Sequence, residues 1–180
     1  SKAAADHLAR AWQRTSDLPV IITNTCNNYG PFQFPEKLIP LTIVRALMGL
    51  SVNLYGDGLQ VREWLHVADH AGGLLDVLER GRVGDSYNLG SGEESTNLAL
   101  VSSLCTLLDD LRPDPAGPRE RLITLVPDRP GHDRRYAIDS TKVRTVLGWQ
   151  TRTALADGLA DTVRWAVSYT HLTLPTISDV

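Results

Sequence analysis

The sequence predicts an α/β protein in which short apolar strands alternate with amphipathic helices. The apolar run at residues 20–22 is short and follows Pro19, as expected for a buried parallel strand. A loop rich in glycine, proline and amides comes next, and apolar residues then recur with helical spacing from Leu38 to Met48. With 180 residues, of which 42% are hydrophobic and 22% charged, the chain is long enough to bury a core.

Residues 27–38, here called the organising loop, follow that strand. Ligands of open α/β sheets bind beyond the carboxyl ends of the strands, which is where this loop begins. Asn27 and Asn28 offer hydrogen-bond donors and acceptors side by side. Pro35 suits the first turn of the next helix, so Lys37 should lie near a helix N-terminus that already attracts anions. The loop is therefore a candidate binding site, the alternative being an ordinary surface loop.

Hydrophobic periodicity and turn residues divide the rest of the chain. The predicted helices are residues 1–14, 35–49, 68–80, 98–111, 141–147 and 153–168. The predicted strands are residues 20–25, 52–55, 61–67, 86–90 and 122–126, with a short extended piece at 136–139. Residues 112–120 and 128–135 are predicted loops.

Three finer predictions concern pairing, caps and buried faces. The turn at residues 56–58 predicts that the strands on either side of it pair with one another. Asn97 and Ser140 stand where N-caps are expected. The inward-facing residues are predicted to be Leu74, Leu75, Val77 and Leu78 in one helix and Leu155, Leu159, Val163 and Ala166 in another.

Composition argues against several classes of partner. The formal net charge is −3, so no general attraction to nucleic acid or to an anionic membrane is expected. No apolar run reaches the length of a membrane span, and no signal peptide is recognised at the start. Cys26 and Cys105 are too few for a disulfide framework and lack metal-ligand spacing, so we expect no metal and a cytoplasmic setting.

The C-terminal residues 168–180 continue no pattern of the chain. Residues 168–176 resemble translated sequencing-adapter sequence, so we expect a non-native tail and exclude it from the fold prediction. The alternative is a short native extension that favours strand structure. If the tail is non-native, a chain that ends at Val167 should melt at the same temperature.

Four segments together resemble the dTDP-glucose 4,6-dehydratases, which are extended short-chain dehydrogenase/reductase enzymes. The organising loop and the run at residues 129–139 are specific to this branch, whereas Ser1-Lys2 is common to the superfamily. The sequence departs from the family pattern at Thr25 and Cys26, where Cys-Ser is common, and at Glu63, where Asp is usual. The four segments are residues 1–8, 26–40, 55–70 and 129–139.

The resemblance implies the C-terminal part of a Rossmann-type NAD-binding fold together with a smaller α/β domain that binds the sugar nucleotide. Residues 1–34 would end the Rossmann domain, and residues 35–167 would form mainly the substrate domain, with some strands returning to the Rossmann sheet. The family's glycine-rich phosphate loop, catalytic tyrosine and proton-handling trio have no match in this sequence. We therefore expect the 180-residue chain to be inactive by itself.

The resemblance also assigns site residues. Lys2 matches the catalytic lysine, which holds the nicotinamide ribose and lowers the pKa of the tyrosine, and Asn28 matches a contact with NAD. Arg62 matches a diphosphate ligand, a role that suits its planar pair of donors. The implied substrate contacts are Asn27, Lys37, Leu38, Asn53, Leu54, Tyr55, Arg62, Asn97, Arg129 and His132.

The implied reaction is an internal redox dehydration of dTDP-glucose to the dTDP-4-keto-6-deoxy sugar. NAD would take hydride from C4 and return it to C6 after water is lost. Two alternatives stay open, a nucleotide-sugar 4-epimerase of the same superfamily and a non-catalytic module that binds sugar nucleotides. The resemblance further implies a homodimer, and the alanine-rich first helix, with Leu8 and Trp12 among the alanines, supports one because it is apolar over more than one stripe.

Overall fold

Parallel strands join segments that lie far apart in the sequence of this computed structural model, which describes residues 2–170. β1 (Ile22–Thr25) pairs with β5 (Ser86–Leu89), β2 (Asn27–Tyr29) pairs with β4 (Val61–His66), and β3 (Val52–Tyr55) pairs with β7 (Ile123–Val126), each in parallel. β4 also pairs antiparallel with β6 (Glu94–Thr96) and parallel with β8 (Arg135–Tyr136). The mixed α/β fold class predicted from the sequence is confirmed.

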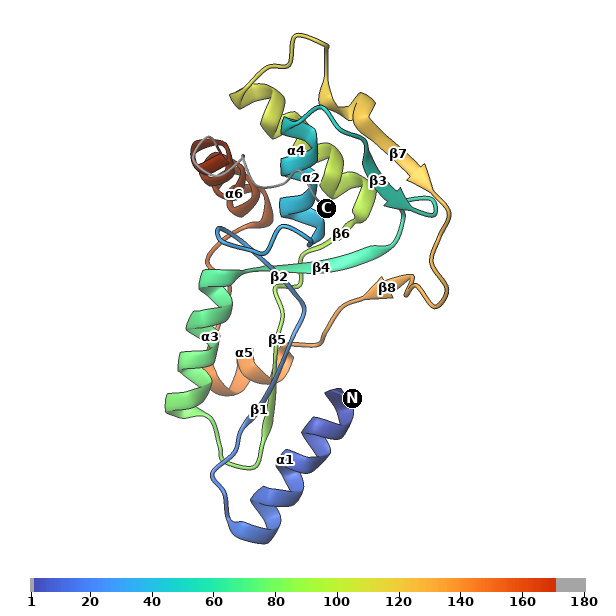
Figure 1. Ribbon diagram of the computed structural model, residues 1–180. Helices are drawn as coiled ribbons and strands as arrows, with labels where there is room; N and C mark the ends of the chain where they lie inside the picture. Colours follow the sequence, from blue (N-terminus) through green and yellow to red (C-terminus); the bar gives the residue numbers. More distant parts are fainter. Residues whose placement is uncertain (1, 171–180) are drawn as a thin grey trace.

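Helices cover these strands and follow the predicted order along the chain (Figure 1). Each α-helix agrees with its predicted range to within a few residues at either end, whereas the short 3-10 helix at Arg119–Leu122 was not predicted. They are α1 (Lys2–Ser16), α2 (Leu38–Leu47), α3 (Val67–Arg80), α4 (Asn97–Leu111), the 3-10 turn η1 (Arg119–Leu122), α5 (Thr141–Leu147) and α6 (Leu155–Thr170).

The buried side chains form two clusters. The larger one joins α2, α4 and α6 to β3 and β4, and includes Ile43, Leu104 and Val163. The smaller one joins β4, β5, α3 and α5, and includes Tyr87 and Leu147. Figure 1 shows α2, α4 and α6 grouped at one end of the molecule and α1, α3, α5, β1 and β5 at the other.

Two predictions about strands were wrong. Asn27–Tyr29, expected in a loop, forms β2, because its backbone pairs with Trp64, Leu65 and His66 of β4. The predicted hairpin between β3 and β4 does not form, because β3 pairs in parallel with β7 and β4 pairs with β2, β6 and β8. Both differences come from pairing between distant segments, which local strand preference does not encode.

The face that α3 buries also differs from the prediction. Val77 is buried as expected, but Leu74, Leu75 and Leu78 are 39%, 59% and 75% exposed. The buried stripe instead consists of Asp69, Gly73 and Val77, since a Cβ on Gly73 would lie 2.9 Å from the indole nitrogen of Trp149 and Asp69 accepts from Thr153 N at 3.0 Å. The prediction for α6 is confirmed, with Leu159, Val163 and Ala166 buried and Leu155 packed against them.

One of the two predicted caps shifts by one residue. Thr96, not Asn97, caps α4, because its hydroxyl accepts from Ala99 N at 3.1 Å. Ser140 is the N-cap residue of α5 as predicted, but its side chain makes no capping bond, and Asp139 Oδ1 accepts from Thr141 N at 2.8 Å instead. Because Asn97 does not cap the helix, its side chain can line a cavity that is described below.

The helix boundaries show two further differences. α2 begins at Leu38, and Lys37 is its extended N-cap residue, so Pro35 lies outside the helix. α6 continues to Thr170, and the Tyr169 ring stacks on Trp165 with centroids 5.3 Å apart. The helix therefore ends two residues later than predicted. That the tail is non-native stays a prediction, and residues 171–180 lie outside the described residues.

Candidate functional site

A cavity of about 380 Å³ lies where the organising loop, β3, β4, the start of α4 and the loop after β7 meet. Every substrate-side residue implied by the resemblance lines it, although these residues come from five separate stretches of the chain. Their roles in binding stay predictions. The lining residues are Asn27, Glu36, Lys37, Leu38, Leu41, Asn53, Leu54, Tyr55, Arg62, Trp64, Asn97, Arg129 and His132.

Cationic side chains dominate the charge of this cavity. Arg62 donates to two main-chain carbonyl oxygens, from Nη1 to Val61 at 2.7 Å and from Nη2 to Asp133 at 2.9 Å, so its guanidinium is held in place without being neutralised. Within residues 2–170, neither Arg62 nor Arg129 forms an ion pair with a carboxylate. Lys37 does pair with Glu36, at 2.5 Å, but both side chains are exposed and water weakens the pairing. The cavity is therefore suited to an anionic group.

Three buried polar atoms on residues that line the cavity lack hydrogen-bond partners within residues 2–170. They are Asn27 Oδ1 from β2, Trp64 Nε1 from β4 and Asn97 Oδ1 from the start of α4. A buried polar atom without a partner costs about 1–3 kcal/mol, so such atoms are uncommon in a protein core. Two acceptors and one donor around one cavity fit a ligand that carries hydroxyl and carbonyl groups.

An aromatic and imidazole pair forms another part of the wall. The rings of Tyr55 and His132 meet edge to face, with centroids 6.3 Å apart. His132 Nδ1 lies 2.7 Å from Asp128 Oδ1, and this hydrogen bond holds the pKa of Asp128 below its ordinary value. Tyr55 is 49% exposed, so its ring is free to contact a flat group such as a nucleobase.

The predicted cofactor residues lie outside this cavity. The Asn28 side-chain amide lies between two partners, with Thr25 Oγ1 donating to its Oδ1 at 3.3 Å and His70 Nδ1 lying 2.8 Å from its Nδ2. Lys2 is exposed at the start of α1. Figure 1 shows α1 beside β1, at the opposite end of the molecule from α2 and β3, which contribute to the cavity. The structure thus brings the predicted substrate residues together but does not bring Lys2 to them.

Of the three residues that depart from the family pattern, Cys26 and Glu63 are buried and Thr25 is partly buried. Burial first, and then the nearby Glu63 carboxylate, raise the pKa of the Cys26 thiol to about 11, so the thiol stays protonated. Glu63 accepts from Gly92 N at 2.7 Å and from Ile138 N at 2.8 Å. Glu63 therefore connects β4 to the loop that contains Gly92 and to the loop that contains Ile138. Its position in the sequence did not reveal this role.

Trp64 and His70 are candidate site residues that sequence reasoning missed. Both lie in the segment 55–70, which is one of the four that carry the resemblance. The resemblance therefore pointed to this segment but gave no role to either residue. Trp64 is 5% exposed and reads from sequence as an ordinary core residue of a strand. His70 reads as a helix-surface residue, and only the approach of β2 to α3 gives it Asn28 as a partner.

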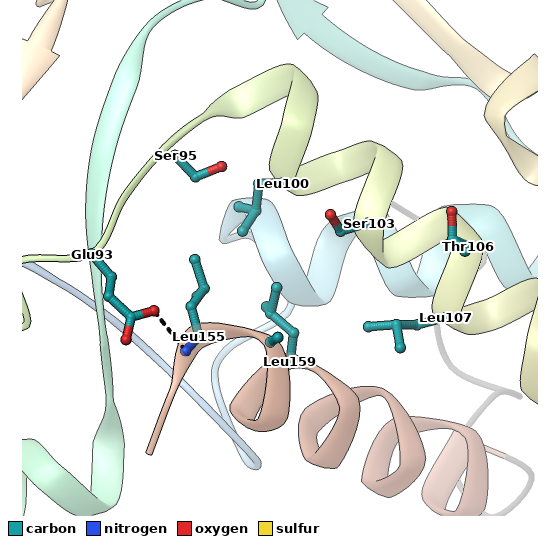
Figure 2. A pocket seen from close by; sticks show the side chains of 9 residues that line it. Glu93, Ser95, Leu100, Ser103, Thr106, Leu107, Leu155 and Leu159 are labelled. Atoms are coloured by element: carbon teal, nitrogen blue, oxygen red, sulfur yellow. Dashed lines mark hydrogen bonds between the residues drawn. The ribbon is translucent and has the colours of Figure 1, made fainter. Parts of the chain in front are cut away.

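A second cavity, of about 500 Å³, lies between α4 and α6 (Figure 2). Four of its nine lining residues are leucines, and it contains none of the predicted site residues. Glu93, which lines it, already accepts from Leu155 N at 2.8 Å. This cavity therefore lacks the unpaired polar groups of the first one.

The described residues form neither a metal site nor a helix that could span a membrane. Among residues 2–170, no group of three or more His, Cys, Asp or Glu side chains is arranged to hold a metal ion. No helix in the described part of the chain has the length and hydropathy that crossing a membrane would require.

Parallel strands with helices around them, and a cationic cavity at the strand ends, define an α/β protein of the Rossmann-type class. The sequence profile described as GDP-mannose 4,6 dehydratase matches residues 1–162. The chain belongs to this family.

Relatives within the family are more specific. The chain is 56% identical over 168 residues to dTDP-glucose 4,6-dehydratase of Neisseria gonorrhoeae, covering 92% of this chain and 49% of the relative. The crystal structure of dTDP-glucose 4,6-dehydratase from Bacillus anthracis, solved in complex with NAD, is 44% identical and superposes with a TM-score of 0.85, covering 95% of this chain and 52% of that one. The chain thus spans about half the length of the curated relatives it matches, and it corresponds to their C-terminal part.

An epimerase structure is also similar, at lower identity. UDP-glucose 4-epimerase of Thermotoga maritima, solved with UDP-glucose, is 27% identical, with a TM-score of 0.80 over 93% of this chain and 52% of that one. The resemblance to dehydratases stated from the sequence is confirmed, and the epimerases share the fold at a greater distance in sequence.

Proposed function

We propose that this chain is the substrate-binding part of a dTDP-glucose 4,6-dehydratase, a lyase that converts dTDP-glucose to the dTDP-4-keto-6-deoxy sugar and water. The observation that carries the proposal is the single cavity lined by every predicted substrate residue. Identity of 56% to a dehydratase, against 27% to an epimerase, favours this activity over 4-epimerisation. The product suits a deoxysugar pathway.

The cavity offers a partner for each part of a nucleoside diphosphate sugar. Arg62 and Arg129 supply cationic donors for the two phosphates, with Arg62 already oriented by its carbonyl contacts. Tyr55 and His132 offer a ring surface to the base. Asn27 and Trp64 lie at the end of the cavity formed by β2 and β4, where they suit the sugar hydroxyls.

NAD is the implied cofactor, and this chain would hold only part of it. The fit rests on Asn28, whose amide is fixed from both sides by Thr25 and His70 and so presents one orientation to a ligand. Lys2 would hold the nicotinamide ribose from the start of α1. When bound, NAD supplies a hydride acceptor for C4 of the sugar and later a hydride donor for C6. The chain's own residues bind and orient the sugar nucleotide.

Assembly and location extend the proposal. α1 buries none of its residues, and Leu8 and Trp12 are 63% and 60% exposed. Apolar side chains on one helix face support a homodimer formed through α1, which sedimentation of the full-length protein and of an Ala9→Asp variant would test. The free, buried Cys26 and Cys105 support a reducing, cytoplasmic setting.

Two measurements test the function. Titration calorimetry of the 180-residue chain with dTDP should give saturable binding, whereas a chain with both Arg62 and Arg129 changed to Ala should not bind. The full-length protein with NAD should form the 4-keto-6-deoxy sugar from dTDP-glucose, and the 180-residue chain should not. Interconversion of the C4 epimers without loss of water would show an epimerase, and binding without turnover by the full-length protein would show a non-catalytic module.

A further inference from the structure

Gln60 lies directly behind the wall of the cavity and is not itself a lining residue. It precedes β4, and only 2% of its surface is exposed. Burying a side-chain amide is unfavourable unless hydrogen bonds compensate, whereas a leucine of similar size would fill the same space without that cost. The contacts that Gln60 makes therefore indicate why an amide is useful at this position.

The side chain of Gln60 reaches the loop after β7. Its Nε2 donates to Asp128 Oδ2 at 3.1 Å. The other carboxylate oxygen, Oδ1, accepts from Arg129 N at 2.9 Å and lies 2.7 Å from His132 Nδ1. Asp128 is thus held from both sides, and the His132 ring is oriented through it.

The main chain of Gln60 reaches a different wall of the same cavity. Its carbonyl oxygen accepts from Asn97 N at 3.0 Å. Asn97 begins α4 and lines the cavity, as His132 does. One buried residue therefore fixes two cavity residues that are 35 positions apart in the sequence.

Gly56 leaves the space that this arrangement needs. Its φ is +61°, and a Cβ built on it would lie 2.9 Å from both Asp128 Oδ2 and Gln60 Nε2. Any larger residue at position 56 would push against the hydrogen bond between Gln60 and Asp128. The turn at residues 56–58 and Gln60 thus act on the same contact.

We propose that Gln60 is a positioning residue of the binding cavity, which holds Asp128 so that Asp128 fixes the ring of His132 with Nδ1–H toward the carboxylate. This leaves His132 Nε2, which has no partner within residues 2–170, available to an acceptor or donor of the bound nucleotide. The ligand in this inference rests on the proposed function, but the orientation of His132 does not. The partner of one ring nitrogen decides which nitrogen carries the proton, so the arrangement has a spectroscopic signature.

The first test needs no ligand. Long-range ¹H–¹⁵N correlation spectra of the 180-residue chain near pH 8 should show neutral His132 as the Nδ1–H tautomer. In Gln60→Leu the signals should move toward the Nε2–H tautomer, as they should in Asp128→Ala. His132 signals that are unchanged in Gln60→Leu would overturn the proposal.

The second test uses dTDP as the probe. Gln60→Leu should weaken dTDP binding by about three- to tenfold, the effect expected for one lost hydrogen bond. In an Asp128→Ala background the same change should have almost no further effect, since Gln60 acts through Asp128. Full additivity of the two losses would overturn the proposal.

Leu108→Ala is the matched control for lost stability. Leu108 is fully buried in α4 and does not line the cavity, so its variant should melt earlier yet bind dTDP with an affinity changed by less than about twofold. If Gln60→Leu fails to fold, Gly56→Ala disturbs the same contact from the opposite side and should give the same shift of the His132 signals. If the unaltered chain does not bind dTDP, the proposed function fails, whereas the tautomer spectra still decide the role of Gln60.

Discussion

The side-chain amide of Asn28 and the imidazole of His70 lie 2.8 Å apart, between Nδ2 and Nδ1. Asn28 belongs to β2 and His70 to α3, so the contact joins the organising loop to the helix that follows β4. Because the amide nitrogen of Asn28 can only donate, Nδ1 of His70 must be unprotonated to accept. Desolvation lowers the pKa of His70 from its ordinary value of 6.5, which keeps the ring neutral.

This contact predicts a loss of stability in mild acid. A histidine whose folded-state pKa is depressed contributes stability that is present above its unfolded pKa and is lost as the pH falls toward the folded value. The melting temperature should therefore fall as the pH is lowered from 7 to below about 6, because His70 takes up a proton only on unfolding. His70→Asn, whose side-chain oxygen can still accept, should flatten this dependence.

Thermal melts between pH 5 and pH 8 provide the check, with His7→Asn as the matched control. His7 is exposed on α1, so that variant should follow the unaltered chain. An equal acid dependence in the unaltered chain and in His70→Asn would show that His70 does not titrate on unfolding.

The ion pair between Arg119 and Asp109 is predicted to be the salt bridge that matters most for stability. The atoms Nη1 and Oδ1 are 2.6 Å apart, and the Arg119 side chain is 4% exposed. Arg119 also donates to the carbonyl oxygens of Ala46 and Arg112, so it joins the ends of α2 and α4. Asp109→Ala should cost about 3–5 kcal/mol in the free energy of unfolding, because it leaves a buried guanidinium without its carboxylate.

Urea denaturation of Asp109→Ala and Asp161→Ala separates a buried pair from an exposed one. Asp161 pairs with Arg164 across one turn of α6, with both side chains more than half exposed, so its loss should be small. Similar losses in the two variants would contradict the assignment.

Arg62→Ala in the full-length protein should weaken binding of dTDP-glucose. The diphosphate would lose a charge-assisted partner, for which we expect about 1.5–3 kcal/mol. Arg62→Lys keeps the charge but loses the planar pair of donors. Its affinity for dTDP-glucose should therefore lie between that of the unaltered protein and that of Arg62→Ala. Calorimetry measures all three, and an unchanged dissociation constant in Arg62→Ala would remove this residue from the site.

Both cysteines are predicted to be unreactive in the folded chain. Burial is the main cause that raises the pKa of each thiol, Cys26 and Cys105, to about 11, so almost no thiolate exists at pH 8. A thiol-specific disulfide reagent should therefore react slowly with the folded chain and rapidly with both thiols in guanidinium chloride. Rapid reaction of either thiol in the folded chain would contradict its burial.

The sequence by itself determined the α/β class and the approximate place of each helix. It did so because apolar spacing and turn residues are local signals, and α2, α4 and α6 follow them closely. It also supplied the substrate-side residues, through a resemblance carried by four short segments. Those segments are continuous in the chain, so pattern alone was enough to find them.

Only the tertiary structure decided which strands pair and which side chains meet. β3 pairs with β7, about 70 residues further along, rather than with its neighbour β4, and no local pattern encodes that choice. Long-range pairing of β2 with β4 likewise made Asn27–Tyr29 a strand, and the fold placed His70 against Asn28. Gln60 had no predicted role, and it connects Asn97 with Asp128 only because three distant segments converge on it.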